Sequence, residues 1–187
     1  MGRPKNYERD KVIQEAMELF WLKGYAATSL NDLADATGLN KKSLYNEFGS
    51  KEALFKAALD RYNASRFPRV TLLNRKPLGR QNIIDYLQGL ATDSSRRGCL
   101  LSLSVHERTT LEDDASRQVR EDFRALAQLF EMNLRAETGA DEAAVQGQAL
   151  LLGSQLFSVA GMGKLGFTKA QVRAAIDALI DGVVERH

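Results

Sequence analysis

The sequence predicts an all-α fold, with a small N-terminal unit over residues 1–60 and a larger helical domain over residues 61–187. Helix formers such as Ala, Leu, Glu, Arg and Gln are abundant, and only three of the 187 residues are proline. Apolar residues recur every three or four positions, and no run of alternating β-branched residues suggests a strand. With 44% hydrophobic and 27% charged residues, the chain fits a small globular unit joined to a larger one.

The first helix is predicted within residues 6–25, "NYERDKVIQEAMELFWLKGY". Ile13, Ala16, Met17 and Phe20 recur at helical spacing and form one apolar face. Gly24 follows them, and glycine readily adopts the left-handed conformation that ends a helix.

Two short helices and the start of a fourth follow. Ser29 can cap the second helix, with Asp32 three residues on as in a capping box, and Gly38 ends it. Asn40 can cap the third helix, and a fourth starts at Lys51. The inward positions are Leu30, Leu33 and Ala34 in the second helix and Leu44 and Phe48 in the third.

The outward face of the third helix is polar. At about 100° per residue, Lys42 and Asn46 lie opposite the apolar positions, and Ser43 and Tyr45 lie on the flanks. All four side chains can form hydrogen bonds. A solvated surface is the ordinary interpretation of any one of them, so the combination carries the argument.

Lysines stand in the first turns of two helices, where Lys41, Lys42 and Lys51 meet the positive end of the helix dipole. A cation there loses about 0.3–1 kcal/mol. A bound anion makes the lysine favourable at this position, since free N–H groups, the helix dipole and a lysine together form a phosphate site. A helix, a glycine-containing turn and a helix with a polar outer face are typical of the helix-turn-helix motif, whose second helix enters the major groove.

The N-terminus begins with Gly-Arg-Pro, and an arginine on such an arm can lie in a narrow minor groove. Arg3 is therefore a candidate DNA contact. The alternative is a tail with incidental charge.

The segment from about Tyr7 to Leu59, and especially "LFWLKGYAATSLNDLADATGLNKKSLYNEFGSKEALF", resembles the DNA-binding domain of the TetR family of transcriptional repressors. The pattern LFxxKGY, TSLxxLAxxxG and xLYxxFxSKExL is matched almost without gaps. The resemblance implies a helix-turn-helix domain followed by a larger helical domain for ligand binding and dimerisation. It also implies that Thr28, Tyr45 and Lys51 contact phosphates. It places Lys42, Ser43 and Asn46 against base edges.

Residues 61–80 contain six basic and no acidic residues. They are expected to form the end of the fourth helix and a linker that contains Pro68 and Pro77. The positive charge would attract DNA. Further helices are predicted near 81–92, 98–110 and 116–137.

Residues 143–163, "AAVQGQALLLGSQLFSVAGMG", carry no charge. Three glutamines, two serines and four glycines make the segment only moderately apolar, which argues against a membrane span. Such a helix is expected to be buried on more than one side. One side would line the core with Val145, Ala149, Leu152 and Leu156, and another would meet a partner with Gln148, Leu151, Gln155 and Ser158.

The final helix begins with a capping box from Thr168 to Gln171. It presents an apolar stripe of Val172, Ile176, Leu179 and Val183. Two such helices at the end of a chain suit a four-helix homodimer seam, which is where the TetR family dimerises. The alternative is that both helices pack only within one chain.

The resemblance also implies an apolar effector pocket among the middle helices. Candidate wall residues are Leu87, Leu103, His106, Phe123, Phe130 and Phe157. Any one of the aromatic residues is otherwise ordinary core, and His106 is otherwise a structural histidine.

Cys99, in "SSRRGCLLSLSVHE", is the single cysteine. It stands near a predicted helix start, close to Arg96 and Arg97, and both features favour the thiolate. A Gly-Cys-Leu at this place resembles a subset of TetR-like regulators, some of which sense electrophiles or oxidants. The alternative is a small buried hydrophobic residue.

Two classes of function follow. The first is a homodimeric regulator that binds a palindromic double-stranded DNA operator and is released by a small molecule or a reactive species. The second is a small helical enzyme or carrier with an accessory DNA-binding module. No CxxC, HExxH, GxxxxGK[ST] or GxSxG motif occurs, so an enzyme, a cofactor and a metal are not expected. A lone cysteine and the lack of a signal peptide indicate the cytoplasm.

Overall fold

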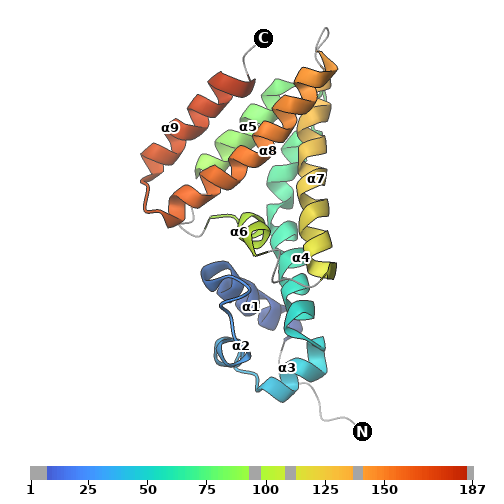
Figure 1. Cartoon of the computed structure of the whole chain (residues 1–187), viewed down its shortest axis with the longest axis vertical. Coiled ribbons are helices and arrows are strands. Elements are labelled where there is room, and N and C mark those ends of the chain that lie inside the picture. The colour runs from blue at the N-terminus through green and yellow to red at the C-terminus, as the bar shows by residue number, and fades with distance from the viewer. Residues whose placement is uncertain (1–7, 93–97, 108–112, 137–140, 185–187) are drawn as a thin grey trace.

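The structure, a computed structural model, describes residues 8–92, 98–107, 113–136 and 141–184. Within those ranges every regular element is a helix, which confirms the predicted all-α class (Figure 1). The helix-turn-helix unit lies at one end of the molecule, and the C-terminal helices gather at the other. Arg3 and the Arg96–Arg97 pair lie outside the described residues.

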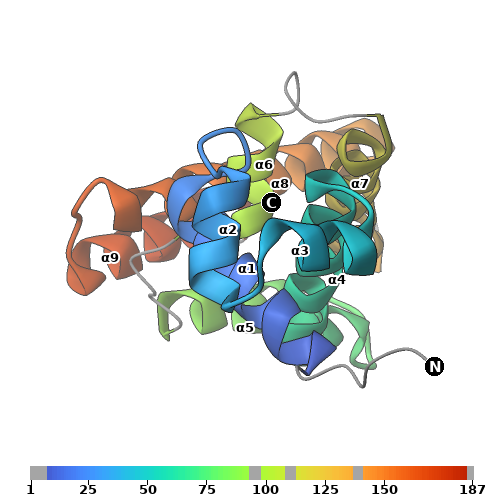
Figure 2. The ribbon, with the colours of Figure 1, turned by 90° about the horizontal axis from the view of Figure 1, so that it is seen from below.

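The N-terminal unit consists of α1 (Arg9–Lys23), α2 (Leu30–Thr37) and α3 (Lys41–Phe48). Its helix ends follow the predicted local chemistry. Ser29 and Asp32 form the capping box of α2, and the Asn40 side chain accepts the Ser43 N–H at 2.9 Å to cap α3. Gly24 ends α1 with a φ of 87°. Seen from below, α2 and α3 lie toward the viewer (Figure 2).

Helix α4 (Lys51–Val70) runs through the predicted division between residues 60 and 61. The prediction of a linker at Pro68 was wrong, because Pro68 lies inside the last turn of α4. Proline removes one helical hydrogen bond. Packing of α4 against α1, α5, α6 and α7 nevertheless holds the helix to its end. A single rod therefore joins the two halves of the chain.

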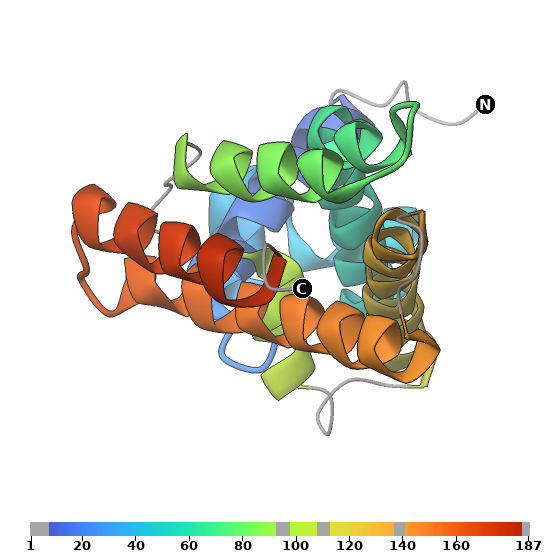
Figure 3. The same cartoon turned by 90° about the horizontal axis from the view of Figure 1, so that it is seen from above.

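The larger half begins with a 3₁₀ turn, η1 (Thr71–Asn74), and then α5 (Arg80–Thr92). Helix α6 (Leu100–His106) is short and lies between the two halves, as Figure 1 shows. Two long helices, α7 (Asp113–Arg135) and α8 (Glu142–Lys164), pack side by side. The chain continues through α9 (Lys169–Leu179) into a π-helical segment, η2 (Ile180–Val184), and the view from above shows α5, α8 and α9 together (Figure 3).

Two hydrophobic clusters stabilise the fold. The first lies under the helix-turn-helix unit and contains Phe20, Leu33, Leu44 and Phe55, all almost completely buried. This cluster is completed by side chains from α6 and α7, namely Leu100, Leu101, Ala115 and Val119. The second cluster joins α5, α7, α8 and α9 at the other end. The helix-turn-helix unit therefore shares a hydrophobic core with α6.

The apolar stripe of α9 lies inside the protomer. Val172, Ile176 and Leu179 belong to the second cluster, and Ile176 has no exposed surface at all. Val183 packs against the same cluster. The prediction that Val172, Ile176 and Leu179 form a dimer seam was therefore wrong, because α5 and α8 already cover these side chains.

The uncharged stretch at 143–163 lies within α8, where Val145, Ala149 and Leu152 are buried as expected and Leu156 is partly buried. None of the described helices combines the length and hydropathy that crossing a bilayer requires.

Candidate functional sites

Helix α3 presents a polar face to the solvent. Lys41, Lys42 and Asn46 are exposed, and half of the Tyr45 surface is accessible. Ser43 is partly exposed, while Leu44 on the opposite side is 3% exposed and anchors the helix to the first cluster. The five predicted polar residues of α3 are therefore all at least partly accessible, on the helix that Leu44 anchors.

Thr28 does not share this face. It is 1% exposed, and its hydroxyl donates to the Gly24 carbonyl at 2.5 Å. In this conformation the Thr28 hydroxyl does not face the solvent, and the predicted phosphate contact of Thr28 stays a prediction. Its hydroxyl instead fixes the turn between α1 and α2.

Lys51 lies at the start of α4, as predicted, but its ammonium is turned toward the protein. Nζ donates to the carbonyls of Tyr25 and Thr28, each at 3.0 Å, and lies 4.1 Å from the centroid of the Tyr25 ring. Burial lowers the pKa of Lys51, and the nearby Glu107 carboxylate acts in the opposite direction. Two of the three ammonium donors are thus used to hold the α1–α2 turn.

Glu107, directly after α6, holds the same α1–α2 turn by binding backbone amides of that turn. Its carboxylate accepts the Tyr25 N–H at 2.7 Å and the Ala26 N–H at 3.1 Å. A Cβ on Gly24 would lie 2.6 Å from this carboxylate, and the φ of 87° at this position also favours glycine. We call Glu107 with the amides of Tyr25 and Ala26 the Glu107 clasp. It joins α6 to the segment that leads into α2.

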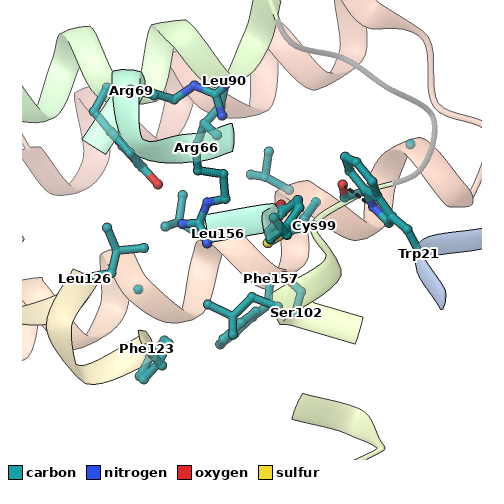
Figure 4. Close-up of a pocket in the computed structure, with 18 of the residues that line it drawn as sticks. Trp21, Arg66, Arg69, Leu90, Cys99, Ser102, Phe123, Leu126, Leu156 and Phe157 are labelled. Atoms are coloured by element: carbon teal, nitrogen blue, oxygen red, sulfur yellow. Dashed lines mark hydrogen bonds between the residues drawn. The ribbon is translucent and has the colours of Figure 1, made fainter. Parts of the chain in front are cut away.

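A cavity of about 140 Å³ opens between α4, α6, α7 and α8 (Figure 4). The rings of Phe123 and Phe157 stack along one side, with centroids 5.1 Å apart. On another side the Trp21 indole donates to the Gly98 carbonyl at 3.0 Å, beside the start of α6. The cavity therefore touches α1 and α6, which both contribute to the core beneath the helix-turn-helix unit. Its remaining polar lining includes Tyr62, Ser65, Arg66, Arg69, Tyr86, Cys99 and Ser102.

The cavity is built from fewer of the predicted residues than expected. Cys99, Phe123 and Phe157 line it. Leu87 and Phe130 do not, because they are fully buried in the second cluster, and Leu103 also lies outside the lining. The side chain of His106 lies outside the described part of the structure.

Cys99 is half-buried at the cavity wall, one residue before α6. Its side chain forms a hydrogen bond with the Tyr62 side chain, and burial raises the pKa of that phenol. Gly98 precedes it with a φ of 72°, and a Cβ there would overlap the Ala160 carbonyl oxygen. The Gly-Cys pair therefore fits α6 closely against α8.

Sequence reasoning missed Trp21, Arg66, Ser102 and Glu107. The basic run at 61–80 was interpreted as a DNA-attracting linker, yet Arg66 and Arg69 extend from α4 to the cavity. Their spacing of three on a continuous helix was the available signal. Among the described residues, no group of His, Cys, Asp and Glu side chains has the geometry of a metal site.

Comparison with known proteins agrees with the fold and with the motif. Residues 12–58 match the family model described as "Bacterial regulatory proteins, tetR family". The chain is 39% identical over 121 residues to the HTH-type transcriptional repressor ComR of Escherichia coli K12, covering 61% of this chain and 56% of ComR. It is 32% identical over 111 residues to the repressor BdcR of the same organism, covering 56% of each protein. The matched region thus spans about half the length of these two relatives.

Solved structures share the fold. The TetR family regulator CifR, a cysteine mutant complexed with 26-bp double-strand operator DNA, superposes with a TM-score of 0.83 at 24% identity, covering 97% of this chain and 100% of CifR. The reduced form of Escherichia coli NemR gives a TM-score of 0.77 at 22% identity, covering 92% of this chain and 95% of NemR. Residues 12–58 therefore carry the DNA-binding region described by the tetR family model, and the whole chain shares the fold of these solved TetR family regulators.

Proposed function

We propose that the protein is a transcriptional repressor that binds a palindromic operator as a homodimer, with α3 of each protomer in the major groove. The exposed polar face of α3 is the observation that carries this proposal. Asn40 caps the helix, so Lys41 and Lys42 occupy its first turn beside N–H groups that can meet phosphates. Lys42, Ser43 and Asn46 are the candidates for contacts with base edges.

The dimer is proposed to form through the outer face of α8, with α9 beside it. Leu150 and Leu151 are 59% and 42% exposed, although large apolar side chains on a helix are normally covered. Gln148, Gln155 and Ser158 lie along the same helix with partial or full exposure. Exposed Ala170, Ala174 and Ala178 of α9 are small enough to allow close approach of a second copy.

A ligand in the cavity is proposed to release the operator. The cavity wall includes the start of α6, and α6 is joined to the α1–α2 turn by the Glu107 clasp and by the first cluster. A shift of α6 on ligand binding would therefore change the angle of α2 and α3. The ligand must bind the released conformation more tightly than the DNA-binding one for this to occur.

Modification of Cys99 by an electrophile or oxidant is a second candidate signal, favoured by its position on the same wall. Cys99→Ser separates the two. A non-covalent ligand keeps its effect on operator binding in this variant, whereas an electrophile loses it.

Selection of bound fragments from genomic DNA by the purified protein tests the proposed function. We expect one enriched palindromic site, bound by an even number of protomers in native mass spectrometry. Enrichment of no sequence, or binding by a single protomer to an asymmetric site, would overturn the proposal.

A further inference from the structure

Arg66 places a positive charge in the wall of the cavity. Its side chain extends from α4 toward Leu156 and Cys99, as Figure 4 shows. Arginine remains charged at neutral pH. The described lining residues include two arginines and no acidic residue.

The side chains that Arg66 contacts at the cavity wall are neutral. Its guanidinium lies 5.4 Å from the centroid of the Tyr62 ring and forms a hydrogen bond with the Tyr86 side chain. Burial raises the pKa of both phenols, so neither supplies a negative charge at pH 7. Asp122 lies with Arg66 at a separate hollow and accepts a hydrogen bond from Asn63 at 2.6 Å. Burial raises the pKa of Asp122, and the Arg66 charge acts in the opposite direction. Among the described carboxylates, none forms an ion pair with Arg66.

Ser102 provides a second, independent observation. It is 5% exposed, lies on the cavity wall in α6, and its Oγ has no hydrogen-bond partner among the described residues. Buried hydroxyls normally have a partner. Two residues on, the Ser104 hydroxyl follows that rule and donates to the Leu100 carbonyl at 2.8 Å. The Ser102 hydroxyl therefore remains able to donate to a molecule in the cavity.

The rest of the wall fits an apolar group of limited size. The space is lined by Phe123, Phe157, Leu126 and Leu156. The Phe123 ring packs so closely on Gly153 that a Cβ at residue 153 would lie 3.0 Å from it. An engineered apolar cavity of about 150 Å³ holds one benzene molecule, which is close to the volume found here. A single aromatic ring with one charged substituent matches both the volume and the polarity.

We propose that the cavity binds a small aromatic carboxylate, whose anionic group pairs with Arg66 and accepts a hydrogen bond from Ser102. The ring lies among the phenylalanine and leucine side chains. Only the consequence of this binding for operator release rests on the proposed function. Binding itself is a property of the free protein and is measured without DNA.

Trp21 is the single tryptophan of the chain and lines the cavity, so its fluorescence reports occupancy. Benzoate and benzamide, a neutral molecule of nearly the same shape, are the probes. We expect benzoate to bind at least about tenfold more tightly than benzamide, since charge-assisted pairs with arginine are among the stronger polar contacts. Equal affinities, or no response to benzoate, would overturn the proposal.

Variants locate the contact. Arg66→Gln should reduce benzoate affinity about tenfold, to the level of benzamide, and leave benzamide binding unchanged, while Arg66→Lys retains part of the preference. Ser102→Ala should weaken benzoate alone. Arg61→Gln is the matched control, because Arg61 lies on the same helix and binds Gln14 away from the cavity. If Arg66→Gln does not fold, the benzoate preference of the wild type and its reduction in Ser102→Ala decide the question.

A separate titration with operator DNA distinguishes the two proposals. If DNA is bound and benzamide releases it as well as benzoate does, the inference fails and the proposed function stands. If no operator is bound while benzoate still binds through Arg66, the proposed function fails and the inference stands.

Discussion

Replacing Glu107 by alanine tests whether α6 controls the DNA-binding unit through the Glu107 clasp. The change removes the acceptor for the N–H groups of Tyr25 and Ala26, at 2.7 and 3.1 Å, and a carboxylate near Lys51. A hydrogen bond to a charged group contributes about 1.5–3 kcal/mol. The Tyr25 amide is partly buried and bears most of this loss, whereas water can replace the carboxylate at the exposed Ala26 amide. We expect the free energy of unfolding to fall by about 2–3 kcal/mol.

The same variant should bind operator more weakly and respond less to a cavity ligand, because α6 no longer holds the turn that leads into α2. Urea denaturation and fluorescence anisotropy with labelled operator measure the two effects. Glu107→Gln retains one acceptor oxygen and should lie between wild type and Glu107→Ala. Glu121→Ala, an exposed glutamate of α7, is the control. If Glu107→Ala matches this control in stability, in operator affinity and in ligand response, the reasoning is refuted.

Three further predictions follow from single contacts. Gly98→Ala should lower the free energy of unfolding by about 1–3 kcal/mol because of the positive φ alone, and the overlap with the Ala160 carbonyl should lower it further. The melting temperature should therefore fall clearly. An unchanged melting temperature would contradict the close fit of α6 against α8. Asn133→Ala should lower the free energy of unfolding by about 3 kcal/mol, because its fully buried amide forms hydrogen bonds with Gly79, Asn82, Leu73 and Leu129. Urea denaturation measures this loss. A loss below about 1 kcal/mol would mean that water replaces the amide. Leu151→Arg should shift sedimentation toward monomer, whereas Met132→Arg, at an equally exposed site on α7, should not; a stable dimer in both would move the proposed interface elsewhere.

Local features were the most predictable from sequence. The capping boxes at Ser29 and Thr168 and the cap at Asn40 form as expected, because each depends on residues within three positions. The inward positions of α1 and α3 follow from periodicity alone. The polar face of α3 is the outer side of the same pattern.

Features that depend on distant residues were not predictable in this way. Thr28 and Lys51 are turned inward by contacts with Gly24 and Tyr25, across the α1–α2 turn. Ile176 lies in the protomer core because α5 and α8 cover α9, and an apolar stripe does not reveal which surface covers it. Arg66 reaches the cavity only because α4 continues past the expected linker through Pro68.

The central claim, that α3 reads operator DNA, is tested most directly by the affinity of Lys42→Ala for the selected operator and for operators substituted at single base pairs. We expect Lys42→Ala to lose about 1–3 kcal/mol on the selected site and to discriminate less at one base pair in each half-site. Lys164→Ala, an exposed lysine at the end of α8, should retain wild-type affinity and preference. Wild-type affinity and base preference in Lys42→Ala would contradict the account.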